Sequence, residues 1–242
     1  MIGVVVPAHN EEVLLGRCLA SVRMAAADPR LGGETVHVVV ALDRCSDRSA
    51  EIAAAHGATG LVVCGGNVGS ARDAGMRAAI ATGARWLAST DADSVVPPDW
   101  LSSQLACGGD AFCGMVAVDD WLDYACDVRT AHEHRHPRRD GHLHVHGANL
   151  GLAAEIYLRC GGFPAIAAHE DVALVDALVA CGAQIARCAA PIVLTSARRS
   201  PRARQGFGDY LRALEARVQS ATVLGGSGER HPVDPLPVAH GP

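Results

Sequence analysis

The sequence predicts a single α/β domain in which a mostly parallel sheet carries helices on both faces. Short apolar runs alternate with helical patterns four times between residues 2 and 91. Polar and acidic residues follow the ends of these runs, and 49% of the 242 residues are hydrophobic, enough for one large core. Open parallel sheets bind ligands beyond the carboxyl ends of their strands, so we expect the functional residues there.

The first half of the chain supplies four predicted strands and three predicted helices. Each strand is a short, largely apolar run, as expected for a buried parallel strand. The predicted strands are 2–6, 36–42, 61–63 and 86–90. Helices are expected over about 13–22, 46–55 and 67–81, with Asn10 and Ser46 as N-caps of the first two.

The second half continues this pattern less regularly. We expect helices over 97–106 and 170–180, strands over 112–118 and 191–195, and a strand end, helix and turn within 149–163. An apolar stripe from Phe207 to Val218 predicts a helix over 206–222 that docks on its own domain or on a partner. Residues 119–145 lack apolar periodicity and are interpreted as an inserted loop, and 223–242 as a disordered tail.

The composition excludes several classes of function. All 21 basic residues are Arg, so Schiff-base chemistry and a P-loop, which need Lys, are excluded. The net charge of −5 argues against a nucleic-acid partner. The N-terminus does not resemble a signal peptide, and no apolar run approaches the ~18 residues of a membrane span. We therefore expect a cytoplasmic protein whose nine cysteines are reduced and mostly buried.

Two carboxylates separated by one residue, Asp91 and Asp93, follow the fourth predicted strand. Hard divalent cations such as Mg²⁺ and Mn²⁺ prefer oxygen ligands and accept a diphosphate as a co-ligand. We therefore interpret the pair as a metal site that would neutralise a departing phosphate. The alternative is a polar turn in which Asp93 caps a helix.

Three other positions are candidates for binding or catalysis. Asp43 follows the second strand and is favoured as a ligand of a ribose hydroxyl or base N–H, whereas Asp47 is equally a ligand or a helix cap. Asp171, beside Glu170 at a predicted helix start, is a candidate general base or simply part of a charged first turn. Arg72, after the Gly-rich residues 65–69, is either a diphosphate ligand or an exposed helix residue.

Two His trios alternate along the chain: His132, His134 and His136, then His142, His144 and His146. On a strand, a period of two would place each trio on one face, an arrangement that suits Zn²⁺. Because the segment is polar and Pro137 interrupts it, a zinc site is the lesser alternative. His146 adjoins the apolar run GANLGL and is a separate candidate for the functional site.

Six motifs stand in an order that resembles the family 2 glycosyltransferases of GT-A fold. Between Ile2 and about Leu174 they are PAHNEE, LDRCSDRSAEIA, NVGSARDAG, DADS, HGANLGL with GGF, and HEDVAL. The resemblance implies a GT-A domain over 1–222, with a nucleotide-binding half (1–95) and an acceptor half (96–222). The QxxRW signature of processive synthases is absent, which favours transfer of a single sugar.

The resemblance also implies roles for the matching residues. The donor would contact Pro7, Ala8, Asn10, Glu11, Asp43, Arg72, Asp91 and Asp93. Arg72 matches the Arg of the family's ARN-like motif, although Asp73 stands in place of its Asn. Asp91 and Asp93 would hold Mn²⁺ or Mg²⁺, with Asp93 the more direct ligand. Asp171 would be the general base, supported by Glu170.

The expected function is therefore metal-dependent, inverting transfer of one sugar from a nucleoside-diphosphate sugar to an acceptor hydroxyl. Four arginines late in the chain are interpreted as a clamp for the diphosphate, because no acidic residue lies near them in sequence, with a solvated basic loop as the alternative: Arg198, Arg199, Arg202 and Arg204. The alternatives are a sugar nucleotidylyltransferase, a nucleotide-sugar-binding protein without catalysis, and a zinc-dependent hydrolase built on the His trios.

Overall fold

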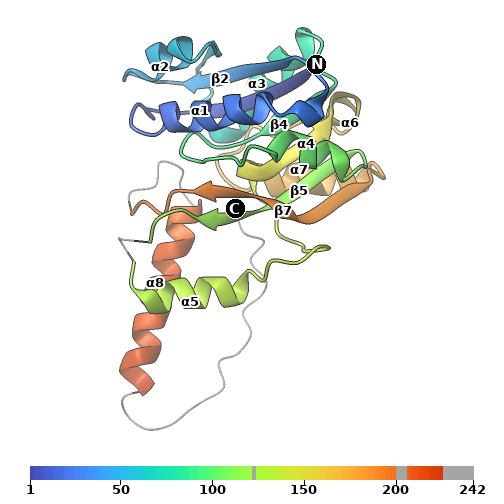
Figure 1. The fold of residues 1–242 in the computed structure, drawn as a ribbon. Helices are drawn as coiled ribbons and strands as arrows, with labels where there is room; N and C mark the ends of the chain where they lie inside the picture. Colours follow the sequence, from blue (N-terminus) through green and yellow to red (C-terminus); the bar gives the residue numbers. More distant parts are fainter. Residues whose placement is uncertain (122–123, 200–205, 226–242) are drawn as a thin grey trace.

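A computed structural model describes residues 1–121, 124–199 and 206–225 of the chain. The described residues form a seven-stranded sheet in the order β3-β2-β1-β4-β6-β5-β7 (Figure 1). The strands are β1 (Ile2–Ala8), β2 (Val36–Asp43), β3 (Thr59–Val63), β4 (Trp86–Ser89), β5 (Ala111–Val118), β6 (Leu150–Ala153) and β7 (Ile185–Thr195). Only β6 among them runs antiparallel to its neighbours. The predicted α/β fold is confirmed.

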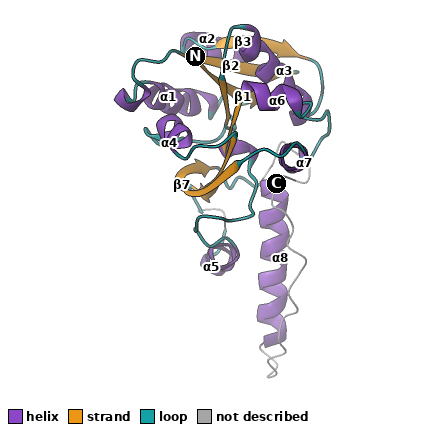
Figure 2. Ribbon diagram, turned by 90° about the vertical axis from the view of Figure 1, so that its right-hand side faces the viewer, coloured by secondary structure: helices purple, strands orange, loops and turns teal. Residues whose placement is uncertain are grey.

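Helices cover both faces of the sheet, as the sequence predicts (Figure 2). On one face pack α1 (Leu15–Ala26), α2 (Ser49–Ala55) and α4 (Trp100–Ala106). On the other pack α3 (Val68–Ala81), α6 (Ala154–Arg159) and α7 (Glu170–Ala180). A glycine allows α3 to approach β1 closely, because a Cβ on Gly75 would lie 2.4 Å from Cγ1 of Val5.

A third apolar cluster lies between α5 (Cys126–Arg135) and α8 (Phe207–Gly225), beyond the β7 edge of the sheet (Figure 1). The expected docked helix is confirmed, since Leu211 and Leu214 of α8 are buried against Val128 of α5. The interpretation of 119–145 as a loop was wrong, because α5 lies within it. The buried face of α5 includes His132, and this imidazole conceals the helical apolar period that identifies such a helix.

Several sequence-based boundaries also need correction. Asn10 does not cap α1, which begins five residues later; it has a φ of 54° and its Oδ1 accepts a hydrogen bond from Ser46 N. Ser46 does not cap α2; instead Asp47 Oδ1 accepts from the backbone N–H of Ser49. The last helix ends at Gly225, not at 222, and residues 226–242 of the expected tail lie outside the described residues.

The cysteines are less buried than expected. Cys18 and Cys113 are buried, whereas Cys64, Cys107 and Cys126 are exposed and the other four are half-buried. Among the described residues we find no helix with the length and apolarity of a membrane span.

Candidate active site

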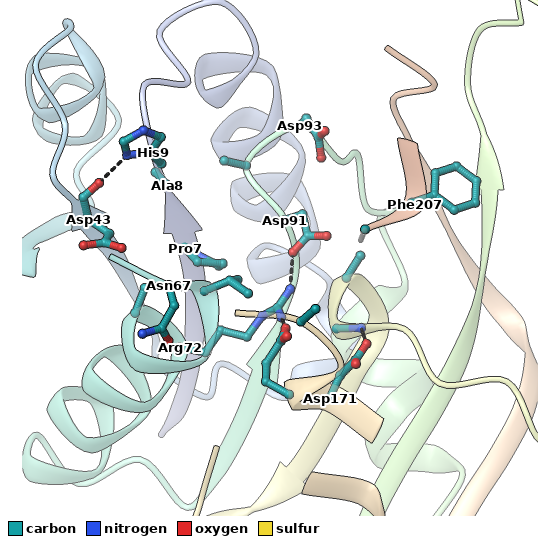
Figure 3. A pocket seen from close by; sticks show the side chains of 18 of the residues that line it. Pro7, Ala8, His9, Asp43, Asn67, Arg72, Asp91, Asp93, Asp171 and Phe207 are labelled. Atoms are coloured by element: carbon teal, nitrogen blue, oxygen red, sulfur yellow. Dashed lines mark hydrogen bonds and ion pairs between the residues drawn. The ribbon is translucent and has the colours of Figure 1, made fainter. Parts of the chain in front are cut away.

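A pocket of about 500 Å³ lies at the carboxyl ends of β1, β2 and β4 (Figure 3). Its walls also include the start of α3, the segment before β6, the starts of α7 and α8, and the residues after β7. Of the candidate site residues, those that line it are Pro7, Ala8, Glu11, Asp43, Arg72, Asp91, Asp93, Glu170 and Asp171. Asn10 is not among the lining residues, since its side chain binds the loop after β2.

The loops after β1 and β2 are tied together at one end of the pocket. His9 Nδ1 lies 2.7 Å from the carbonyl oxygen of Asp43, and Asp43 Oδ1 accepts a hydrogen bond from Gly66 N at 3.0 Å. Asp47 lies outside the lining, where its carboxylate accepts from the backbone N–H groups of Glu12 and Ser49. The Asp47 carboxylate is therefore engaged by backbone N–H groups next to α2, whereas Asp43 stands at the pocket.

Arg72 lies at the centre of a buried ion-pair chain. Its Nη1 pairs with Oε1 of Glu170, and its Nη2 lies 2.5 Å from Oδ1 of Asp91 (Figure 3). The Arg72 side chain is 5% exposed and that of Glu170 is 6% exposed. Arg72 is thus not an exposed helix residue. Both of its terminal nitrogens are engaged by carboxylates of the pocket.

A second guanidinium, that of Arg198, bridges two further carboxylates. Its Nη atoms lie 2.6 and 2.8 Å from the two carboxylate oxygens of Glu11, and Nη2 lies 3.1 Å from Oδ2 of Asp93. The expectation that the late arginines lack acidic partners was wrong, because the fold brings Glu11 to Arg198 across 187 positions. Arg199 pairs with Glu215 of α8 instead. Arg202 and Arg204 lie outside the described residues.

Two carboxyl groups of the pocket hold protons more tightly than usual. Burial, together with the charge of Asp91, raises the pKa of Asp93 to about 6. Burial also raises the pKa of Asp171, against the opposing effects of Arg72 and of two backbone N–H donors. Those donors are Gly147, 2.7 Å from Oδ2, and Val172, 2.8 Å from Oδ1. Asp171 is therefore a fixed carboxylate with increased basicity, the properties of a general base.

The oxygen-rich pair Asp91 and Asp93 fits a hard divalent cation better than a soft one. After burial, the charge of Asp91 is the next cause of the raised pKa of Asp93, and a cation would relieve this repulsion. Within the described ranges no three or more His, Cys, Asp or Glu side chains gather as a ready metal site. The two carboxylates thus fit a metal that takes further oxygens from its ligand.

The first His trio does not lie as a strand would place it, whereas the rings of the second trio stack in sequence along a segment without helix, His142 on His144 at 5.9 Å and His144 on His146 at 6.0 Å. His132 and His136 are one helical turn apart at the end of α5, and their rings stack at 4.3 Å. The His136 ring in turn lies 4.8 Å from that of His144. His146 is buried and lines the pocket, as its sequence position suggested.

Among the lining residues that sequence reasoning did not assign to the site are Arg44, Gly206 and Phe207. Gly206 and Phe207 bring the start of α8 to the pocket, although Phe207 had been assigned to the apolar stripe alone (Figure 3). Arg44 lines it with a φ of 51°, a conformation that usually favours Gly. Gly206, directly before the first residue of α8, was the available signal that a turn precedes the helix here.

Comparison with known families gives one match. Residues 3–134, slightly more than half of the chain, match the model described as Glycosyl transferase family 2. No curated protein matches the chain.

Solved structures with a similar fold include TarS 1–349 of S. aureus in complex with UDP-GlcNAc, with a TM-score of 0.62 and 14% identity over 90% of this chain and 66% of that one. The mannosyltransferase PcManGT from Pyrobaculum calidifontis, in complex with GDP-Man and Mn²⁺, has a TM-score of 0.59 and 15% identity over 95% and 76%. Glucosyl-3-phosphoglycerate synthase from Mycobacterium tuberculosis, in complex with Mn²⁺, UDP and phosphoglyceric acid, has a TM-score of 0.55 and 19% identity over 96% and 80%. The chain spans 60% and 36% of two further TarS chains. At these identities the likeness concerns the fold.

Proposed function

The chain belongs to glycosyl transferase family 2, and from this premise we propose that it transfers one sugar from a nucleoside-diphosphate sugar to an acceptor hydroxyl, with inversion at the anomeric carbon. The observation that carries the proposal is the meeting of two carboxylate pairs in one pocket. Asp91 and Asp93 follow β4, while Glu170 and Asp171 begin α7, and all four line the same cavity. One pair suits a cation and diphosphate, and the other suits proton abstraction.

On the donor side, the tied loops after β1 and β2 would hold the nucleoside. Asp43 is fixed by Gly66 N–H and presents its carboxylate to the pocket, where it can accept from a ribose hydroxyl or a base N–H. Asp91 and Asp93 would hold the divalent cation, as the fold relatives bound to Mn²⁺ and a nucleotide suggest. When bound, such a cation neutralises negative charge on the departing diphosphate.

On the acceptor side, Asp171 would take the proton of the attacking hydroxyl. The two backbone N–H groups that hold its oxygens fix the direction of the carboxylate, and burial increases its proton affinity. Glu170 would act as a positioning residue, because it pairs with Arg72 and so links the base to Asp91. The bond from the sugar to the diphosphate breaks as the bond to the acceptor oxygen forms, and Asp171 keeps the proton.

The test uses Asp171→Asn, with Asp176→Asn as a matched control. Asp176 lies on the same helix but is exposed and does not line the pocket. We expect Asp171→Asn to lower turnover by roughly 10²–10⁴, the usual effect of a general base, and to leave nucleotide-sugar binding intact. Binding is measured as thermal shifts with UDP-GlcNAc, UDP-glucose and GDP-mannose, each with and without Mn²⁺. Unchanged turnover in Asp171→Asn would contradict the assignment of the base.

One observation favours a second candidate, a nucleotide-sugar-binding protein without catalysis. Both carboxylates of the expected metal pair are engaged by arginines, Asp91 by Arg72 and Asp93 by Arg198. In that case a nucleotide sugar binds equally well with and without Mn²⁺, and no acceptor accelerates its consumption. Transfer requires the opposite result in both measurements.

A further inference from the structure

Two cysteines outside the pocket lining lie close enough to react with each other. Sγ of Cys188, on β7, donates a hydrogen bond to Sγ of Cys107, and the two sulfurs are 2.9 Å apart. A disulfide bond is about 2.05 Å long, so the sulfurs are roughly 0.9 Å from bonding distance. The residues are 81 positions apart in the sequence. The tertiary fold, not local chain geometry, therefore brings the two thiols together.

We propose that Cys107 and Cys188 are a reversible modification site, at which exchange with a low-molecular-weight disulfide links the end of α4 to β7. The proposal goes beyond sugar transfer and does not rest on it. Neither cysteine lines the pocket.

The surroundings of the two thiols suit this exchange. Cys107 is exposed and follows the last residue of α4, so a small disulfide can reach it. Gly108 and Gly109 come next with φ values of 71° and 88°, a flexible type of sequence that can absorb a small shift of Cys107. Cys188 is half-buried and fixed within β7, where it lies opposite Gly114 of β5. One thiol is thus accessible, and the other is held in place beside it.

The order of events follows from these positions. Burial and the hydrogen bond to Cys107 raise the pKa of Cys188 to about 12, so Cys107 is the thiol that reacts first. Its thiolate attacks one sulfur of the small disulfide, forms a mixed disulfide and releases one small thiol. The thiolate of Cys188 then attacks Sγ of Cys107 and releases the second small thiol. Two protein thiols are oxidised, and one small disulfide is reduced to two thiols.

Two other cysteines show why the reaction is expected at Cys107 and Cys188 and not elsewhere. Cys113 lies on β5 next to Gly114, the residue opposite Cys188, but it is buried, and burial raises its pKa to about 11. Cys126 is exposed at the start of α5 and serves as a matched control. Exposure alone therefore does not select the reactive cysteine. The adjacent second thiol does.

The experiment treats the full chain with 2-hydroxyethyl disulfide, blocks the remaining thiols with iodoacetamide and maps the products by mass spectrometry. Unfolded in denaturant, the reduced protein takes up nine labels, one for each cysteine. After oxidation we expect one linked peptide pair containing Cys107 and Cys188, whereas an exposed cysteine without an adjacent thiol, such as Cys126, keeps a mixed disulfide. Cys188→Ser should keep the mixed disulfide at Cys107, because the second step is removed. Cys126→Ser should behave like the wild type at Cys107 and Cys188.

A second measurement addresses the fold. A cross-link of this span typically raises the melting temperature by roughly 4–16 °C for a domain of this size. We expect this rise on oxidation of the wild type and none in Cys107→Ser/Cys188→Ser. A mixed disulfide that persists at Cys107 in the wild type as it does in Cys188→Ser would overturn the proposal. So would a linkage from Cys188 to Cys113.

Discussion

The buried ion pair between Arg72 and Glu170 permits a sharp test of what Arg72 does. The change is Arg72→Met, which keeps the length of the side chain but removes its charge. Both partners are about 95% buried, so the substitution leaves the carboxylate of Glu170 without its cation in the interior. Breaking a buried pair on one side costs about 3–5 kcal/mol. Asp91 adds little to this cost, because it is 36% exposed and screened by solvent.

For a domain of this size, this cost corresponds to a fall of roughly 6–20 °C in melting temperature. Adding Glu170→Gln to Arg72→Met should restore most of the loss, because the stranded charge is then gone. The assay is calorimetric melting at pH 7.5, with nucleotide binding measured in parallel. Arg77→Met is the control, since Arg77 lies on the same helix but forms an exposed pair with Asp73 worth about 0–1 kcal/mol.

Two results would refute this reasoning. One is an unchanged melting temperature in Arg72→Met. The other is a failure of Glu170→Gln to recover stability in the double variant. If Arg72→Met instead melted like the wild type and lost nucleotide affinity, Arg72 would be a diphosphate ligand, as the resemblance to the family implies.

Three further predictions concern the pocket and the core. Folding raises the pKa of Asp93 from an ordinary 3.8 to about 6. Between these two pH values the folded state binds more protons than the unfolded chain. The free energy of unfolding therefore falls as the pH rises from about 4 to about 6. Asp93→Asn should therefore melt higher than the wild type at pH 7 in EDTA while losing any Mn²⁺-dependent thermal shift; a lower melting temperature would contradict the charge argument. Because burial raises the pKa of Asp171, the turnover number should fall on acidification with a midpoint above 3.8, and a profile that stays flat down to pH 4 would speak against this base. Gly75→Ala should destabilise the protein by about 1–3 kcal/mol in urea unfolding, because its Cβ would lie 2.4 Å from Cγ1 of Val5; a change below 0.5 kcal/mol (about the scatter of neutral surface changes) would mean that α3 shifts freely.

Local sequence patterns were sufficient for much of the sheet and for one side of the pocket. The run from Ile2 to Val6 is apolar because β1 is buried on both faces, and the same cause makes the other central strands recognisable. Asp43 ends β2 and Asp91 follows β4, so their place at the rim followed from the strands alone. The strands and the acidic residues at their ends could be predicted because neighbours in sequence identify them.

The ion pairs of the pocket, in contrast, join residues that are far apart in the sequence. Arg72 meets Glu170 across 98 positions, and Arg198 meets Glu11 across 187. Nothing in the residues around Arg198 indicates that a carboxylate lies opposite. The helix α5 was not predicted for a different reason. His132 occupies a buried position of the helix, where the apolar periodicity of a helix normally places an aliphatic residue.

The position of β6 limits where this chain can be divided to make fragments or hybrids. The strand is antiparallel and fills the edge of β4, yet it is formed by residues 150–153, far beyond the predicted nucleotide-binding half. A fragment that stops at residue 95 would present β4 as an open edge, which invites pairing with other molecules. It would also expose Trp86, whose apolar cluster is completed by Phe112 and Val193. Hybrids between related chains should therefore keep β6 together with residues 1–95, so that the edge of β4 stays paired.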